Sequence, residues 1–167
     1  LDADMQKIAQ DALKEKCDSI ESPVPHGGAV AVVNCKTGEL LACATYPSYD
    51  ITTYSDDYSS LLKDKRSPLW NRALQSVYAP GSTSKPSTAL AALEEGVIDE
   101  NTVHDCHYKF RYLDMTFSCI AHHASSNINV KTALQDSCNI FFYKVSRDLG
   151  VEKLNTYREL LGLGQPT

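Results

Sequence analysis

Apolar residues near the N-terminus recur at the spacing of an amphipathic helix. The opening segment, LDADMQKIAQDALKEK (residues 1–16), is otherwise rich in charged and polar side chains. Apolar positions three and four residues apart lie on one face of an α-helix, so the pattern predicts a helix packed on one side. The predicted apolar face consists of Met5, Ile8, Ala9, Ala12 and Leu13.

After a Pro/Gly break, SPVPHGG, the pattern changes to that of β-strands. Two short apolar runs follow, AVAVVN (29–34) and LLACATY (40–46). The five residues between them, CKTGE (35–39), are typical of a turn. The pattern therefore predicts a β-hairpin with buried arms.

The rest of the chain is mainly helical in pattern. A polar, Tyr-rich segment (47–60) is expected to be a loop, and the Cys/His-rich segment 101–128 is expected to be irregular. Helical patterns occupy residues 67–77, 82–96, 129–150 and 151–162. One strand pair among several helices predicts an α+β fold. Because two strands do not form a stable sheet, we expect the fold to be incomplete in this chain.

Bulk properties exclude several classes of function. A length of 167 residues suits about one domain, and the net charge of -5 leaves no basic surface for nucleic acid. No apolar run approaches the ~20 residues that a membrane span needs, and we expect no signal peptide within these residues. The 6 cysteines are too few for a disulfide framework in a chain of this length. Cys35 lies in the predicted turn while Cys43 pairs near Val30, so we expect no disulfide between the two cysteines.

Candidate chemistry begins in the segment YAPGSTSKPSTALAALEEG (78–96), where Ser82 and Lys85 stand at the start of a predicted helix. The simplest interpretation is an N-cap, in which a hydroxyl accepts the first free backbone N–H groups. Alternatively, residues three apart share a helix face, which sets the Lys85 amine beside the Ser82 hydroxyl. A serine becomes a nucleophile only when a base takes its proton, and a lysine is such a base when burial lowers its pKa.

A second polar cluster, Ser137-Cys138-Asn139, interrupts the next helical segment just before the apolar run FFYKV. Polar residues inside a helix are commonly satisfied by backbone carbonyls. However, a hydroxyl that relays a proton and an amide that holds a substrate carbonyl also explain these residues. The pair of clusters therefore indicates acyl transfer.

These motifs together resemble a known family. The segments GAVAVVNCKTGELLACATYPSYD, NRALQSVYAPGSTSKPSTALAALEEG and ALQDSCNIFFYKVSRDLG, in this order, are similar to the transpeptidase domain of penicillin-binding proteins of the monofunctional, class B, elongation type. The resemblance implies a β-lactamase/transpeptidase-like α+β fold, of which this chain would be the N-terminal portion. Residues 1–46 would form its helix and first hairpin, and residues 47–167 its loop and helical subdomain with the active-site helix.

The resemblance also implies a role for each motif residue. Ser82 would be acylated by the D-Ala-D-Ala stem peptide of peptidoglycan or by a β-lactam, with Lys85 as its general base. Ser137 would pass a proton to the leaving group, and Asn139 would bind substrate. The Ser82 N–H would form half of the oxyanion hole. No cofactor would be required.

The resemblance further implies a setting. The partners would be stem peptides, β-lactam antibiotics and other cell-wall synthesis membrane proteins. The catalytic domain would lie on the extracytoplasmic side of the bacterial membrane, with an anchor and an upstream domain that are not in this sequence.

Two departures from the family pattern matter. Lys36-Thr37-Gly38 matches the family's first hairpin turn and not its later K-T-G strand, which we expect beyond Thr167. Ser84 replaces the apolar residue that is usual between Thr83 and Lys85. We therefore expect the fragment itself to be inactive. The alternatives to a transpeptidase are a serine β-lactamase and a non-catalytic β-lactam sensor or degenerate scaffold.

The Cys/His-rich segment raises a separate hypothesis. Thiolates and an imidazole in a set of four are typical tetrahedral zinc ligands, and the elongation-type relatives are similar in this respect. The predicted ligands of a structural zinc are Cys106, Cys119, His123 and Cys138. A disulfide between Cys106 and Cys119 and simple packing of free thiols remain alternatives.

Three further histidines and two residues near Asn71 receive simpler interpretations. The histidines expected to be exposed are His26, His104 and His107. We expect Arg72 to order a loop and Trp70 to pack on the approach to the active-site helix.

Overall fold

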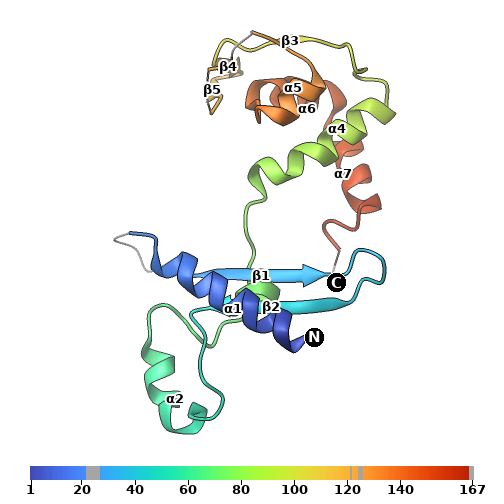
Figure 1. The fold of residues 1–167 in the computed structure, drawn as a ribbon. Helices are drawn as coiled ribbons and strands as arrows, with labels where there is room; N and C mark the ends of the chain where they lie inside the picture. The colour runs from blue at the N-terminus through green and yellow to red at the C-terminus, as the bar shows by residue number, and fades with distance from the viewer. Residues whose placement is uncertain (22–26, 121, 124–125, 166–167) are drawn as a thin grey trace. The chain divides into compact units, whose positions relative to one another are not determined.

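The computed structural model describes residues 1–21, 27–120, 122–123 and 126–165. The chain forms two compact units, Leu1–Tyr78 and Ala79–Thr167, which are treated separately here. Helices and short two-stranded sheets make up both units (Figure 1), in agreement with the predicted α+β class. The division expected after residue 46 falls within the first unit. None of the helices in the described part of the chain is long and apolar enough to cross a membrane.

The first unit contains the predicted hairpin. Strands β1 (Gly28–Val33) and β2 (Leu40–Tyr46) pair antiparallel, with Ala31 opposite Cys43. The Asn34 side chain accepts the Lys36 N–H in the connecting turn, and Gly38 adopts a left-handed conformation there. Lys36-Thr37-Gly38 therefore lies in a hairpin turn, as predicted. Cys35 lies in this turn and Cys43 lies on β2, and both are free thiols in this structure.

Helix α1 (Ala3–Asp18) packs on this hairpin through a narrower face than the sequence predicts. Asp2 caps the helix by accepting the Met5 N–H. Ala9 is buried against Ala42 and Ala44, and Leu13 packs beside them. Of the predicted apolar face, Met5, Ile8 and Ala12 are exposed, so that part of the prediction is wrong. The contact is built from alanines, which lets the helix lie close to β2.

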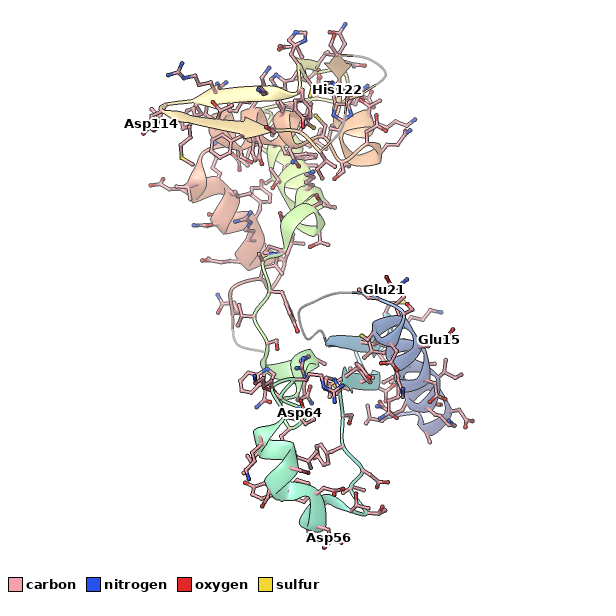
Figure 2. The ribbon with its side chains drawn as sticks, turned by 90° about the vertical axis from the view of Figure 1, so that its left-hand side faces the viewer. Glu15, Glu21, Asp56, Asp64, Asp114 and His122 are labelled. Atoms are coloured by element: carbon pink, nitrogen blue, oxygen red, sulfur yellow. The ribbon has the colours of Figure 1, made fainter. Side chains whose placement is uncertain are left out.

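Two helices follow in the first unit. Helix α2 (Tyr54–Lys63) occupies part of the segment 47–60 that was expected to be a loop, and Asp56 lies in its first turn (Figure 2). Helix α3 (Arg72–Gln75) is a single turn capped by Asn71. The Arg72 guanidinium donates to the backbone carbonyls of Ser67 and Arg66. Arg72 therefore orders a loop, as predicted.

The second unit begins with the segment that carries Ser82. A 3₁₀ turn, η1 (Gly81–Ser84), leads directly into α4 (Lys85–Glu94). Helices α5 (Val130–Gln135), α6 (Asn139–Leu149) and α7 (Val151–Leu160) complete its helical part. Within α4, Ala89 and Ala92 are buried, while Leu90 and Leu93 remain about 40% exposed.

Short strands replace the irregular structure expected at 101–128. Strand β3 (His104–Asp105) pairs with β6 (Asn127–Ile128), and β4 (Lys109–Tyr112) forms a hairpin with β5 (Met115–Ser118). Asp114 lies at the tip of this hairpin (Figure 2). These strands set Cys106 and Cys119 at their ends, facing α6.

The core of the second unit lies around α6. Its largest fully buried side chains are Phe141, Ile128, Ile140, Val145 and Cys138. Cys106 and Cys119 belong to the same cluster. His104 is half-buried against the Phe141 ring, so the prediction that it is exposed is wrong, whereas His107 is exposed as expected. His26 lies outside the described residues.

Candidate active site

Ser82 lies in the 3₁₀ turn immediately before α4, and its side chain is exposed. Gly81, in a left-handed conformation, lets the chain turn sharply there. The Ser82 hydroxyl accepts a hydrogen bond from the Ser137 hydroxyl at 3.0 Å. No side-chain capping hydrogen bond is present in η1 or at the start of α4. The alternative that Ser82 serves as an N-cap is therefore not what the structure shows.

Lys85 lies one 3₁₀ turn after Ser82, where side chains three residues apart are nearly eclipsed. Its amine donates to the Ser137 hydroxyl at 2.9 Å, to the Ser137 carbonyl at 2.7 Å and to the Asn139 side-chain oxygen at 2.7 Å. Among the described residues no hydrogen bond joins Lys85 directly to Ser82. The two are linked through the Ser137 hydroxyl, so all four predicted residues form one chain of contacts.

A break between α5 and α6 presents Ser137 to Lys85. Helix α5 ends at Gln135, and Ser137 follows in a left-handed conformation with φ of 52°. Cys138 then caps α6 by accepting the Phe141 N–H. The two helices cannot continue into each other through this geometry, which explains the run of small polar residues. The Asn139 amide donates to the Ser118 carbonyl, which fixes the orientation of its oxygen toward Lys85.

Lys85 is buried, with 9% of the residue exposed. Burial lowers the pKa of Lys85 below its usual value, while the nearby Cys119 and Cys138 act in the opposite direction. The lowered pKa enlarges the fraction of neutral amine near neutral pH. A neutral amine next to a bridging hydroxyl can accept a proton, as base catalysis requires.

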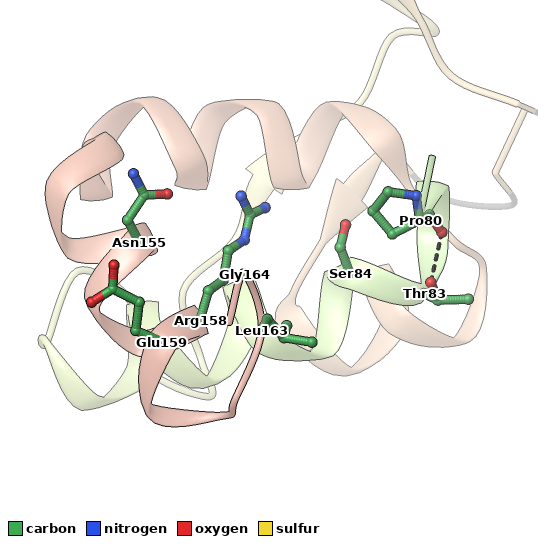
Figure 3. A pocket seen from close by; sticks show the side chains of 8 residues that line it. All are labelled: Pro80, Thr83, Ser84, Asn155, Arg158, Glu159, Leu163 and Gly164. Atoms are coloured by element: carbon green, nitrogen blue, oxygen red, sulfur yellow. Dashed lines mark hydrogen bonds between the residues drawn. The ribbon is translucent and has the colours of Figure 1, made fainter. Parts of the chain in front are cut away.

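Two adjoining cavities lie beside these residues. One, of about 360 Å³, is lined by Ser82, Lys85 and Asn139 together with Arg158. The other, of about 530 Å³, is lined by Ser84, Arg158 and residues of the C-terminal segment (Figure 3). Arg158, on α7, borders both cavities. Sequence reasoning missed it, because no motif marks the turn of α7 that faces the site.

The four residues predicted as metal ligands meet at one point. Cys106 follows β3, Cys119 follows β5, His123 comes from the next loop and Cys138 caps α6. Their ligand atoms all lie within 4.8 Å of one another. The Cys119 sulfur lies 3.1 Å from His123 Nε2 and 3.9 Å from the Cys138 sulfur. Cys106 and Cys119 are free thiols in this structure and not a disulfide.

The donor set fits a tetrahedral zinc ion. Zn–S bonds of about 2.3 Å in a tetrahedron place two sulfurs about 3.8 Å apart, close to the observed separation of Cys119 and Cys138. Burial raises the pKa of the Cys138 thiol. In Cys119 burial acts in the same direction, but hydrogen bonds from the Asn139 N–H and from His123 outweigh it, so the pKa of this thiol is lowered. A lowered pKa favours the thiolate that a metal binds. The opposite nitrogen of His123 lies 3.9 Å from the Asp136 carboxylate, the arrangement common for a metal-bound histidine.

Known proteins are similar to this chain in sequence and in fold. A protein of Escherichia coli named peptidoglycan D,D-transpeptidase MrdA is 36% identical over 146 residues, which cover 83% of this chain and 23% of that protein. The solved structure of PBP2 from Helicobacter pylori matches with a TM-score of 0.86 and 27% identity, over 99% of this chain and 30% of that one. A complex between PBP2 and MreC from the same organism matches with a TM-score of 0.82 and 27% identity, over 96% and 29%.

The curated relatives and the solved structures are thus much longer than this chain, which spans about a quarter of the Escherichia coli protein. The family model described as penicillin binding protein transpeptidase domain matches residues 28–167. This match covers most of the chain and includes Ser82, Lys85, Ser137 and Asn139. The chain belongs to the transpeptidase domain family of the penicillin-binding proteins, as the sequence motifs predicted, and resembles its elongation-type members.

Proposed function

We propose that the full-length protein is a peptidoglycan D,D-transpeptidase that acts through an acyl-enzyme on Ser82. The observation that carries this proposal is the hydrogen-bond chain from the buried Lys85 amine through Ser137 to the exposed Ser82 hydroxyl. An accessible hydroxyl joined to a buried amine is the arrangement that serine acylation needs. The names of the relatives support the same reaction.

In the proposed reaction the Ser82 oxygen attacks the carbonyl carbon between the last two D-alanines of a stem peptide. The Ser82 proton passes to Ser137 while the Ser137 proton passes to the neutral Lys85 amine. The C–N bond then breaks, and the leaving D-alanine nitrogen takes a proton back along the same route. An amine of a neighbouring stem peptide attacks the ester, which forms the cross-link and returns the proton to Ser82.

Asn139 and the Ser82 backbone serve the substrate in this proposal. The Asn139 amide both holds Lys85 and lines the cavity, so we assign it to binding of the acyl donor. The Ser82 N–H supplies one donor to the oxyanion. We place the site on the extracytoplasmic side of the membrane, where peptidoglycan is cross-linked. The solved complex between PBP2 and MreC supports an association of the full-length protein with a second protein.

We also propose that Cys106, Cys119, His123 and Cys138 hold a structural zinc. The close grouping of their ligand atoms supports this proposal, as does the Asp136 carboxylate behind His123. A zinc ion with four protein ligands cross-links the chain and leaves no open position for chemistry. Its expected effect is to fix the segment that carries Ser137 and Asn139, the neighbours of Cys138.

Acylation by benzylpenicillin tests the proposed reaction. The full-length protein is incubated with the antibiotic, the intact mass is followed for several hours, and the adduct is located by peptide digestion. We expect one adduct per chain on the peptide that contains Ser82, and none in the Ser82→Ala variant. Ser60→Ala is the matched control, because the Ser60 hydroxyl bonds only its own helix in the first unit.

The time course separates the alternatives. An adduct that lasts for hours supports a transpeptidase, provided that a stem-peptide donor and acceptor are also joined. An adduct that forms and is lost within minutes indicates a serine β-lactamase. A stable adduct without any peptide joining indicates a sensor. No adduct on folded protein rules out the acyl-enzyme.

A further inference from the structure

Arg158 is a half-buried cation that faces the candidate active site. It extends from α7 and lines both cavities described above, one of which is shown in Figure 3. Within the described part of the chain, its guanidinium forms no ion pair and no hydrogen bond. Arg147, on α6, differs in this respect, since it pairs with Asp148 at 2.7 Å.

The described residues around Arg158 leave its charge without a partner. The polar side chains that share the cavities with it include Ser84, Ser146 and Asn155, which are neutral. Of the described residues that line the two cavities, Glu159 alone is acidic, and it is the next residue on the helix. Adjacent residues on a helix do not face each other, and the two charged groups form no ion pair in this structure.

Lys85, the other cation in the site, is already engaged. Its three hydrogen bonds to Ser137 and Asn139 occupy all three donors of the amine. A negatively charged group entering the cavities from solvent therefore meets only one free cation among the described lining residues, the Arg158 guanidinium. Its planar fork matches a carboxylate through two parallel hydrogen bonds.

We infer that Arg158 determines specificity by binding a carboxylate on the acyl part of the donor substrate. The inference rests on the proposed function, because it assigns a subsite to the same reaction. A D,D-transpeptidase donor loses a single amino acid, whereas its acyl part is several residues long and needs an extended groove. The two cavities share Ser84 and Arg158, so together they provide a groove that extends away from Ser82.

Two β-lactams that differ by one carboxylate test this role. Carbenicillin is benzylpenicillin with an added carboxylate on the acyl side chain. The rate constant for acylation by carbenicillin divided by that for benzylpenicillin therefore reports the effect of this carboxylate. In the full-length protein we expect Arg158→Gln to lower this ratio about tenfold, the effect of one charge-assisted hydrogen-bonded pair worth ~1.4 kcal/mol. Arg158→Lys keeps the charge but loses the fork, and we expect it to restore the ratio in part.

Arg147→Gln is the matched control, because Arg147 lies on α6 outside both cavities and is expected to leave the ratio unchanged. D-alanyl thioesters with an N-succinyl or an N-succinamyl group give the corresponding peptide-like pair. We expect Arg158→Gln to raise KM for the succinyl donor only.

The outcomes distinguish this inference from the proposed function. If Arg158→Gln is acylated normally by benzylpenicillin and the carbenicillin ratio does not change, the carboxylate subsite is wrong while the acyl-enzyme stands. If neither antibiotic acylates the wild-type protein, the proposed function fails and the subsite fails with it. An equal fall for both antibiotics also overturns the inference, because it shows a structural effect and not recognition of the carboxylate.

Discussion

At the scale of single residues, the buried amine of Lys85 sets how the proposed reaction depends on pH. The amine acts as a base only when it is neutral, and burial lowers its pKa below 10.5. The neutral fraction grows as pH rises, so the acylation rate constant is expected to rise with pH and then to reach a plateau. The midpoint of this rise is expected below pH 10.5. Stopped-flow measurement of benzylpenicillin acylation between about pH 6 and pH 10 provides this profile.

Lys85→Arg is the corresponding variant, since a guanidinium stays protonated throughout this range. We expect acylation to fall by about 10²–10⁴-fold and the rising limb to disappear. Lys131→Arg, an exposed lysine on α5, is the control and retains both the rate and the profile. A Lys85→Arg variant that keeps the rising limb would show that another group is the base.

Most of the site could be predicted from the sequence at this scale. The site is built from two short motifs, and within each motif the residues are held close by local backbone geometry. The structure brings the two motifs together through contacts among Ser82, Lys85, Ser137 and Asn139. The motifs do not show that the Ser137 hydroxyl bridges the Lys85 amine and the Ser82 hydroxyl. Arg158 has no motif at all. Its place depends on how α7 packs, which residue types alone do not specify.

At the scale of elements, a side chain joins α1 to the hairpin. Gln6 donates to the Cys43 carbonyl at 3.0 Å and accepts the Cys43 N–H at 2.7 Å, so it fills the place of a neighbouring strand along β2. Gln6→Leu keeps the size of the side chain but leaves both backbone groups without this partner. We expect a loss of about 1–2 kcal/mol in the free energy of unfolding of this part of the protein, measured by urea denaturation.

Gln10→Leu is the matched control, because Gln10 lies on the exposed side of the same helix. We expect its effect to stay within about 0.5 kcal/mol. Equal effects of the two variants would mean that the contact with Cys43 contributes nothing specific. A stabilising effect of Gln6→Leu would mean that apolar packing between α1 and β2 outweighs the two hydrogen bonds.

The elements that the sequence pattern missed are those without an apolar period. Helix α2 contains no buried residue, and its N-cap residue Thr53 makes no side-chain capping bond, so neither usual signal is present. Strands β4 and β5 are four residues long and mostly exposed, too short to show alternation. In α1 the period was correct but the predicted face was too wide, because Ala9 and Leu13 pack on the hairpin while Ile8 is exposed. Gln6 contacts the hairpin where Ile8 was expected.

At the scale of the whole molecule, the second unit holds both the proposed acylation site and the Cys/His cluster. Cys138 stands between Ser137 and Asn139, so one residue connects the two. The Asn139 N–H also donates to the Cys119 sulfur at 3.3 Å. We therefore expect a change in the cluster to alter the positions of the groups that hold Lys85. Through this coupling, the proposed zinc ion would influence acylation without any role in the chemistry.

A zinc ion in this cluster predicts a defined response of the full-length protein. Purified without chelators, the protein is expected to carry about one zinc per chain by elemental mass spectrometry. Because the ion joins β3, β5 and α6, its removal with a strong chelator is expected to lower the melting temperature by about 5 °C or more and to slow Ser82 acylation.

Cys138→Ser removes one of the four ligands, so this variant is expected to lose most of the zinc. Without chelator it is expected to show the same fall in melting temperature and in the rate of Ser82 acylation. Cys35→Ser, in the exposed hairpin turn, retains both the metal and the melting temperature. The acylation rate is the decisive readout. If zinc is present and its removal lowers stability but leaves acylation unchanged, the coupling through Cys138 is wrong. If the protein carries no zinc and the chelator has no effect, the four side chains pack only as free thiols and an imidazole.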